Sequence, residues 1–198
     1  MENNTKMKIL DEALAFFAEN GYKGTNLRDL AAALNITKSA LYRHFDSKEA
    51  IWNAVLDRME EYYTEHFGSP EKLPRVPQSC EELIAMSMHM LEFTMNDQRV
   101  ILIRKLLITE QFRNDRARKL ASLHFLTGTK QMYTKIFAQM MENGLLKQSD
   151  PELLAFAFTS PITVLVQQCD REPENEALIL RQIEAFLRQF VSVYGKES

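Results

Sequence analysis

Residues 25–48 constrain the fold of this chain more than any other stretch of its 198 residues. Apolar residues recur at helical spacing twice within it, first at Leu27, Leu30, Ala31 and Leu34 and then at Leu41 and Phe45. Asn35 lies between the two sets, and Asn adopts the left-handed conformation of a tight turn more readily than most residues. The pattern predicts two short helices packed across a corner, with a third helix starting directly after them.

Two threonines are placed to cap these helices. Thr25 is expected to N-cap the first helix and Thr37 the second, because a threonine hydroxyl accepts an otherwise unbonded backbone N–H. The remaining side chains of the second helix are rich in donors and contain no carboxylate: Lys38, Ser39, Ala40, Tyr42, Arg43 and His44. This composition is typical of a helix that enters the major groove of DNA.

The stretch resembles the helix-turn-helix of the tetracycline-repressor (TetR) family of bacterial transcriptional regulators. The residues that match the family pattern in order are Thr25, Arg28-Asp29-Leu30-Ala31, Thr37, Leu41-Tyr42, His44-Phe45 and Lys48-Glu49. Two residues depart from it: Asn35 replaces the turn glycine, and Ser39 replaces a glycine of the second helix. The resemblance implies a cytoplasmic, DNA-binding regulator, most often a repressor that binds a palindromic operator as a homodimer.

The resemblance and the expected geometry together assign contacts with DNA. Base edges are assigned to Lys38, Ser39, Ala40 and Arg43, where Arg43 suits a guanine and Ala40 a thymine methyl group. Phosphate contacts are assigned to Thr25, Arg28, Thr37, Tyr42, His44 and Lys48. Two such lobes on a twofold axis would read half-sites whose centres are about 34–36 Å apart, or a multiple of that distance.

The rest of the chain also reads as helical, and no β pattern, glycine-rich loop or repeat interrupts it. The expected helices lie at about 5–20, 26–34, 38–44, 47–67, 79–95, 98–109, 115–142, 151–169 and 174–194. The fold class is therefore all-α, with about nine helices. Residues 1–48 are predicted to form the DNA-binding domain, with its helix-turn-helix at about 26–45. A linking helix at about 47–67 and a proline-containing linker at 68–78 lead to a ligand-binding and dimerisation domain at 68–198.

Two surfaces of this second domain are candidate sites. Its last two helices are expected to pair with those of a second subunit as a four-helix bundle, through Phe158, Ile162, Leu165, Ile183, Phe186 and Phe190. Packing of the same residues within one subunit is the alternative. Methionine and phenylalanine side chains suit a cavity for an apolar or amphipathic effector of unknown identity. The candidate lining residues are Met86, Met90, Phe93, Phe112, Phe125 and Met132, with a plain core as the alternative.

Composition excludes several other classes. Cys80 and Cys169 have no metal or redox spacing, and the four histidines are scattered, so neither a metal site nor a cofactor is expected. The N-terminus lacks the apolar core of a signal peptide, and no uninterrupted apolar run predicts a membrane span. No phosphate loop or nucleophile motif supports an enzyme, which stays a remote alternative. A second alternative is a DNA-bound regulator or chromosome-organising protein that acts through a protein partner without a small effector.

Net charge is weak evidence on the partner. The net charge of the whole chain is −3. Residues 1–48 hold seven basic and six acidic side chains, whereas residues 49–198 hold 17 basic and 21 acidic side chains. Screening at physiological salt confines a charge's influence to about 8 Å, so an acidic body does not prevent a small basic lobe from binding DNA.

Overall fold

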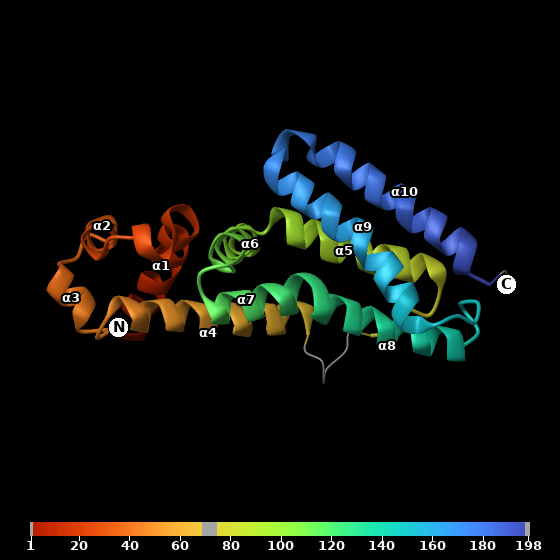
Figure 1. The fold of residues 1–198 in the computed structure, drawn as a ribbon, viewed down its shortest axis with the longest axis horizontal. Helices are drawn as coiled ribbons and strands as arrows, with labels where there is room; N and C mark the ends of the chain where they lie inside the picture. Colours follow the sequence, from red (N-terminus) through yellow and green to blue (C-terminus); the bar gives the residue numbers. More distant parts are fainter. Residues whose placement is uncertain (1, 69–74, 197–198) are drawn as a thin grey trace. The chain divides into compact units, whose positions relative to one another are not determined.

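The computed structural model describes residues 2–68 and 75–196, and these are helical almost throughout (Figure 1). The α-helices are α1 (Glu2–Gly24), α2 (Leu27–Ala33), α3 (Lys38–Tyr42), α4 (Lys48–Phe67), α5 (Cys80–Asn96), α6 (Gln98–Glu110), α7 (Asp115–Ser122), α8 (Gly128–Glu142), α9 (Pro151–Arg171) and α10 (Glu176–Tyr194). A π-helical segment, η1 (Leu123–Thr127), joins α7 to α8, and a 3₁₀ turn, η2 (Pro173–Asn175), precedes α10.

The all-α prediction is confirmed. The described residues contain nine helices when α7, η1 and α8 are counted as the one continuous helix that the sequence predicts at 115–142. Their one β-type pairing is an isolated antiparallel bridge between Leu146 and Gly195. Pro70 and Pro74, which mark the predicted linker, lie outside the described residues.

The chain packs as two compact units. The first comprises the chain up to His66 together with Gln98–Ala121, and the second comprises Phe67–Asp97 together with the chain from Ser122 onward. Helices α6 and α7 therefore pack with the N-terminal lobe, although they follow α5 in sequence. These packing units differ from the predicted functional domains 1–48 and 68–198, a division that stays a prediction.

An apolar core holds the first unit together. Its fully buried side chains come from six helices and include Ile9, Phe17, Leu30, Leu41, Ile51, Leu56, Leu106 and Ala117. Phe17 and Trp52 meet edge to face with ring centroids 5.1 Å apart, and Tyr22 lies 5.2 Å from Trp52. Such pairs add about 0.5–1.5 kcal/mol to the burial of their rings. The lobe is thus supported by α4 and α6, which a three-helix lobe of its small size needs.

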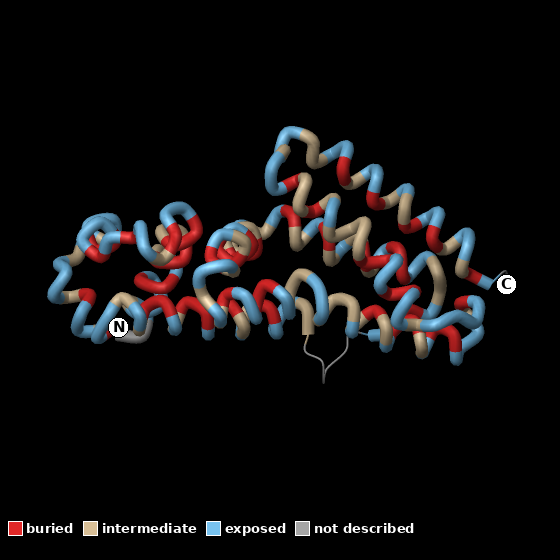
Figure 2. Tube along the Cα trace, viewed as in Figure 1, coloured by how far each residue is buried: buried red, intermediate tan, exposed pale blue. Residues whose placement is uncertain are grey.

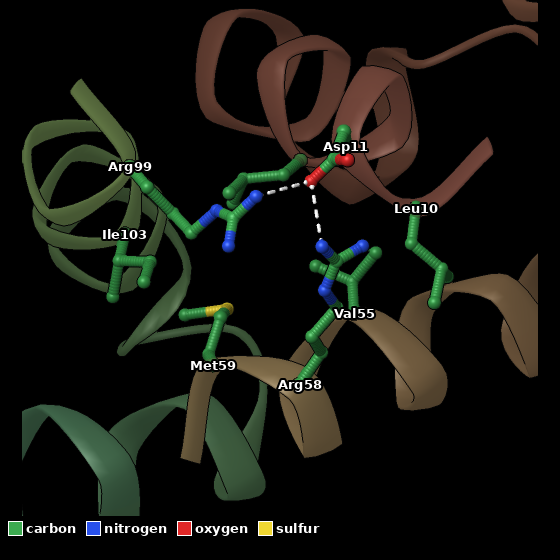
Figure 3. A pocket seen from close by; sticks show the side chains of 8 residues that line it. Leu10, Asp11, Val55, Arg58, Met59, Arg99 and Ile103 are labelled. Carbon is green, nitrogen blue, oxygen red and sulfur yellow. Dashed lines mark hydrogen bonds and ion pairs between the residues drawn. The ribbon is translucent and has the colours of Figure 1, made fainter. Parts of the chain in front are cut away.

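An ion cluster joins α1, α4 and α6 in the same unit. Figure 3 shows Asp11 between two arginines, and its Oδ1 lies 2.8 Å from Arg99 and 3.2 Å from Arg58. The adjacent cavity, which Leu14, Val55 and other apolar side chains also line, has a volume of about 10 Å³. That is room for about one water molecule, so this cavity is too small for an effector.

Aromatic side chains form the centre of the second unit. Phe158 on α9 lies with its ring centroid 4.7 Å from Tyr133 and from Phe190, and 5.2 Å from Phe137. The buried hydroxyl of Tyr133 has one polar partner, Ser87 Oγ at 3.0 Å. Burial raises the pKa of Tyr133 to about 12, against a smaller opposing effect of the Ser87 bond, so the phenol is neutral at physiological pH.

The structure corrects half of the predicted dimer interface. Phe158 and Ile183 are fully buried within the single chain and Phe190 is 4% exposed, so these three side chains offer no surface to a partner. Ile162, Leu165 and Phe186 are half-buried and pack against the same core. For the three buried residues, packing within one subunit is the correct alternative.

A different face of α9 and α10 is exposed and apolar. The two helices lie side by side (Figure 1), and exposed positions recur along both of them (Figure 2). The large apolar side chains on this outer face are Leu153, Phe156 and Val164 on α9 and Leu178 and Val193 on α10, with exposed fractions of 45–67%. Among the described helices α9 is the one long and apolar enough, by length and composition, to cross a bilayer. Its inner face belongs to the core, so its outer face alone remains without a partner.

The structure also separates one predicted pocket residue from the others. Phe112 lies in the turn between α6 and α7, within the first unit, and is 89% exposed. It cannot line an internal cavity, because its ring faces solvent. The other five are half-buried side chains of the second unit, on α5, η1 and α8: Met86, Met90, Phe93, Phe125 and Met132. Their role as pocket residues stays a prediction.

The π-helical segment η1 is held by local hydrogen bonds. The hydroxyl of Thr127 donates to the carbonyl of Ser122 at 3.1 Å, and the hydroxyl of Thr129 donates to the carbonyl of His124 at 3.3 Å. Each bond joins residues five positions apart. The N–H of Gly128 donates to the carbonyl of Leu123. A Cβ at Gly128 would lie 2.5 Å from the Leu123 oxygen, so glycine permits this close approach. The segment begins where the first packing unit ends, at Ala121.

Replacing Gly128 with alanine is expected to destabilise the chain. Alanine favours a helix over glycine by about 0.8–1.0 kcal/mol, but overpacking against backbone costs about 1–3 kcal/mol. We expect Gly128→Ala to lower the melting temperature in a thermal scan, whereas Gln131→Ala, at an exposed position one turn later, leaves it unchanged or raises it. A stabilised Gly128→Ala variant would show that the π-helical segment rearranges at no cost.

Candidate nucleic-acid interface

The corner between α1 and α2 is built differently from the sequence prediction. Asn26, not Thr25, is the N-cap of α2, and its Oδ1 accepts the N–H of Arg28 at 2.9 Å. Thr25 is 4% exposed, and its hydroxyl donates to the carbonyls of Gly21 and Phe16 at 2.9 and 3.1 Å. The predicted cap at Thr25 is therefore wrong. Its side chain also holds the corner from inside, which turns the hydroxyl away from the phosphate contact assigned to it.

The turn and the second helix follow the sequence prediction. Asn35 has a φ of 54°, in the left-handed region. Thr37 is the N-cap of α3, and its Oγ1 accepts the N–H of Ala40 at 3.1 Å. Leu41 is fully buried and Phe45 is 6% exposed, so these two side chains anchor α3 to the lobe. The side of α3 opposite Leu41 and Phe45 is therefore free to contact DNA.

The predicted base-reading residues lie together on that outer side. Lys38, Ser39 and Arg43 are exposed, and Ala40 is half-buried. The ammonium of Lys38 lies 5.5 Å from the centre of the Tyr42 ring, a cation–π arrangement that holds the charge over α3.

Ser39 adds a contact that a glycine at this position would lack. Its hydroxyl is 3.1 Å from that of Thr37, the capping residue. The two hydroxyls therefore share a hydrogen bond at the start of α3, and both are exposed.

The predicted phosphate-contacting residues occupy the flanks. Arg28, Thr37 and Tyr42 are exposed, while His44 and Lys48 are half-buried. Lys48 is the first residue of α4, where Ser47 caps the helix by accepting the N–H of Ala50 at 3.0 Å. Burial lowers the pKa of Lys48, and attraction to Glu110 opposes that shift. The exposed amides at this helix start favour a phosphate oxygen.

Sequence reasoning missed a cation beside α3. The ammonium of Lys6 on α1 lies 5.3 Å from the centre of the Phe45 ring. Nothing in the local sequence signals this approach, because it depends on how α1 packs against the end of α3. The structure brings together no group of three or more histidine, cysteine or acidic side chains with metal-binding geometry among the described residues.

Comparison with known proteins identifies this arrangement. Residues 9–55 match the family model described as bacterial regulatory proteins of the tetR family. Over 47 residues the chain is 53% identical to IcaR of Staphylococcus aureus, the HTH-type negative transcriptional regulator of the biofilm operon icaADBC. Residues 9–55 therefore form a DNA-binding segment of the tetR-family type. The matched segment covers 24% of this chain and 25% of IcaR, so the relationship rests on the DNA-binding lobe.

Solved TetR-family structures share the whole fold. The chain superposes on SmeT, the repressor of the Stenotrophomonas maltophilia multidrug efflux pump SmeDEF, with a TM-score of 0.68 and 21% identity, covering 98% of this chain and 91% of SmeT. A transcriptional regulator from Saccharomonospora viridis in complex with choline gives a TM-score of 0.72 at 16% identity, covering 98% and 100%. At these identities the likeness extends to the fold of the helical body and not to its ligands.

Proposed function

We propose that this chain is a transcriptional repressor that binds a palindromic operator as a homodimer and responds to a small effector. The observation that carries the proposal is the outer side of α3, where Lys38, Ser39 and Arg43 are exposed while Leu41 and Phe45 are buried behind them. Members of the TetR family bind DNA, typically as dimers, and the named relatives IcaR and SmeT are repressors. The family and these relatives are regulators, which leaves the enzyme alternative without support.

DNA reading is divided between α3 and its flanks. Lys38, Ser39 and Arg43 face the groove with base edges in reach, and Arg43 suits the two acceptors of a guanine. Arg28 and Lys48 contact phosphates on either side, which fixes the register of the lobe without reading sequence. One short helix reads few base pairs, so specificity requires a second lobe.

The outer face of α9 and α10 supplies the pairing surface in this proposal. The exposed apolar side chains are Leu153, Phe156 and Val164 on α9 and Leu178 and Val193 on α10. An isologous contact of two such faces forms a four-helix bundle and removes the exposed apolar side chains from water. This surface replaces the buried residues that the sequence analysis assigned to the interface.

A small apolar or amphipathic effector is the proposed ligand of the second unit. The half-buried side chains on α5 and α8, among them Met86, Met90 and Met132, are adaptable and support this choice. An effector acts on operator binding only as far as its affinity differs between the DNA-bound and DNA-free forms. The alternative of regulation through a protein partner predicts that no small molecule both raises the melting temperature and releases the operator.

The test of DNA binding is an unbiased selection of duplex fragments followed by titration of the best one. We expect the wild-type chain to select an inverted repeat and to bind it with a strong dependence on salt. The variant Arg43→Ala should lose about 1–3 kcal/mol of affinity and relax its preference at one base pair per half-site. Arg28→Ala should weaken binding to all sequences alike and lower the salt slope.

Circular dichroism is the control in this experiment, because all of these side chains are exposed and their removal should leave the fold intact. The proposal is overturned if the wild-type chain prefers no inverted repeat, or if a Lys38→Ala, Arg43→Ala double variant binds the selected fragment as tightly as the wild type.

A further inference from the structure

The corner between α1 and α2 contains a backbone donor, the N–H of Tyr22, that bonds to a side chain from another helix. Gly21 breaks α1 with a φ of 68° and a ψ of 171°, a conformation that glycine adopts readily. The N–H of the next residue, Tyr22, donates to a side chain of α6. The corner residues Gly21–Thr25 determine the direction in which α2, and therefore α3, leaves α1.

Glu110, the last residue of α6, accepts this donor. Its Oε1 lies 3.0 Å from the backbone nitrogen of Tyr22. The carboxylate is also directly against Gly21, because a Cβ there would lie 2.6 Å from the same oxygen. Glu110 is 3% exposed, so its bond to Tyr22 is sheltered from water.

Lys48 holds the corner from the opposite helix. Its ammonium donates to the carbonyl of Lys23 at 3.4 Å and lies 4.8 Å from the centre of the Tyr22 ring. Its charge is attracted to Glu110. The corner is thus held by α6 at the N–H of Tyr22 and by α4 at the carbonyl of Lys23. Both contacts are to backbone atoms, so they fix the path of the chain itself.

We infer that Glu110 is a positioning residue for DNA reading, through which α6 sets the orientation of α3. The inference rests on the proposed function. Helix α6 follows α5 directly after Asp97. Withdrawal of the Glu110 carboxylate frees Tyr22 and lets the corner adopt other directions. A reading helix that is correctly directed in only a fraction of molecules binds its operator more weakly by that fraction.

Other contacts between the same helices should not affect the corner as Glu110 does. Asp11 also joins α1 to α6 and α4, through Arg99 and Arg58 (Figure 3). It lies ten residues before Gly21, roughly 15 Å along the helix at 1.5 Å per residue. Loss of the Asp11 cluster should weaken the packing of the unit without releasing the corner. Asp11→Asn is therefore the matched control.

The experiment compares Glu110→Ala, Glu110→Gln and Asp11→Asn in the full chain, on the operator selected by the wild type. Two quantities are measured: the operator affinity at fixed salt, and the rate at which the Tyr22 amide hydrogen exchanges with solvent by NMR. We expect Glu110→Ala to speed that exchange at least about tenfold and to weaken operator binding about tenfold. In Glu110→Gln the operator affinity and the Tyr22 exchange rate should both lie within about threefold of the wild-type values, because the glutamine amide oxygen accepts the same N–H. Asp11→Asn should lower the melting temperature and leave both quantities unchanged.

Several outcomes overturn the inference. One is a Glu110→Ala variant that binds the operator as tightly as the wild type. Another is an Asp11→Asn variant that weakens binding as much as Glu110→Ala does. If Glu110→Ala does not fold, Glu110→Asp keeps the charge and shortens the reach, and faster Tyr22 exchange with unchanged operator affinity in that variant overturns the inference as well. A wild-type chain that selects no inverted repeat overturns the proposed function together with this inference, whereas the other outcomes leave the proposed function standing.

Discussion

The substitution Val164→Asp is expected to convert the protein into a monomer and to abolish its preference for an inverted repeat. Val164 is 65% exposed in the middle of the outer face of α9, between Phe156 and the end of the helix. In an isologous dimer the new carboxylate enters the interface twice, once from each subunit. Burying an unpaired charge costs several kcal/mol, which exceeds what one exposed apolar side chain contributes to pairing.

The loss of operator binding should be larger than the loss from any single DNA contact. Linking two lobes makes the second binding event intramolecular, and this raises the overall affinity by about 10²–10⁴. A monomer forfeits that factor even though its α3 is unchanged. We therefore expect Val164→Asp to bind the selected operator at least about 100-fold more weakly, and to bind a half-site as the wild-type lobe would. Sedimentation equilibrium gives the oligomeric state, and titration of the operator gives the affinity.

Leu126→Asp is the matched control, because Leu126 is a comparably exposed apolar residue at 59% that belongs to η1 and not to α9 or α10. It introduces the same charge and should leave the dimer and the operator affinity intact. A Val164→Asp protein that still sediments as a dimer would place the pairing surface elsewhere.

The sequence of α9 did not predict which of its two apolar sides packs within the chain and which is exposed. The helix is apolar on two sides, with Leu154, Phe158 and Val166 on one and Phe156 and Val164 on the other. Periodicity indicates that each apolar side packs against something. It does not show whether the packing residues belong to the same chain or to a second subunit. The inner side was fixed by Tyr133, Phe137 and Phe190, which approach from α8 and α10. Such long-range packing has no local signal.

The DNA-binding lobe was predicted more fully because its determinants are local. The Thr37 cap, the turn at Asn35 and the buried Leu41 all follow from residues within a few positions of one another. The exception, Thr25, depends on a long-range feature: its hydroxyl is taken by carbonyls of α1, which leaves the cap to Asn26. The contact of Glu110 with Tyr22 was not predicted for the same reason, because 88 positions separate the two residues in sequence.

Removing the ring of Phe158 is expected to cause the largest loss of stability in the second unit. Phe158 is fully buried, and four aromatic rings surround it, those of Tyr133, Phe137, Phe186 and Phe190. A buried Phe→Ala change costs about 3–5 kcal/mol, because it removes apolar burial and leaves a cavity. For a chain of this length that corresponds to a drop of roughly 10 °C in melting temperature. Chemical denaturation should show the loss in the free energy of unfolding without a change in the slope.

Phe156→Ala, two residues earlier on α9, distinguishes core packing from pairing. Phe156 is 60% exposed, so its removal should cost the isolated chain little and should weaken only the dimer. Stability that comes from association depends on protein concentration. The effect of Phe158→Ala should therefore persist in the Val164→Asp background, whereas the effect of Phe156→Ala should vanish there. If Phe156→Ala destabilises that monomer as much as Phe158→Ala does, the outer face of α9 is part of the core and the proposed pairing surface is wrong.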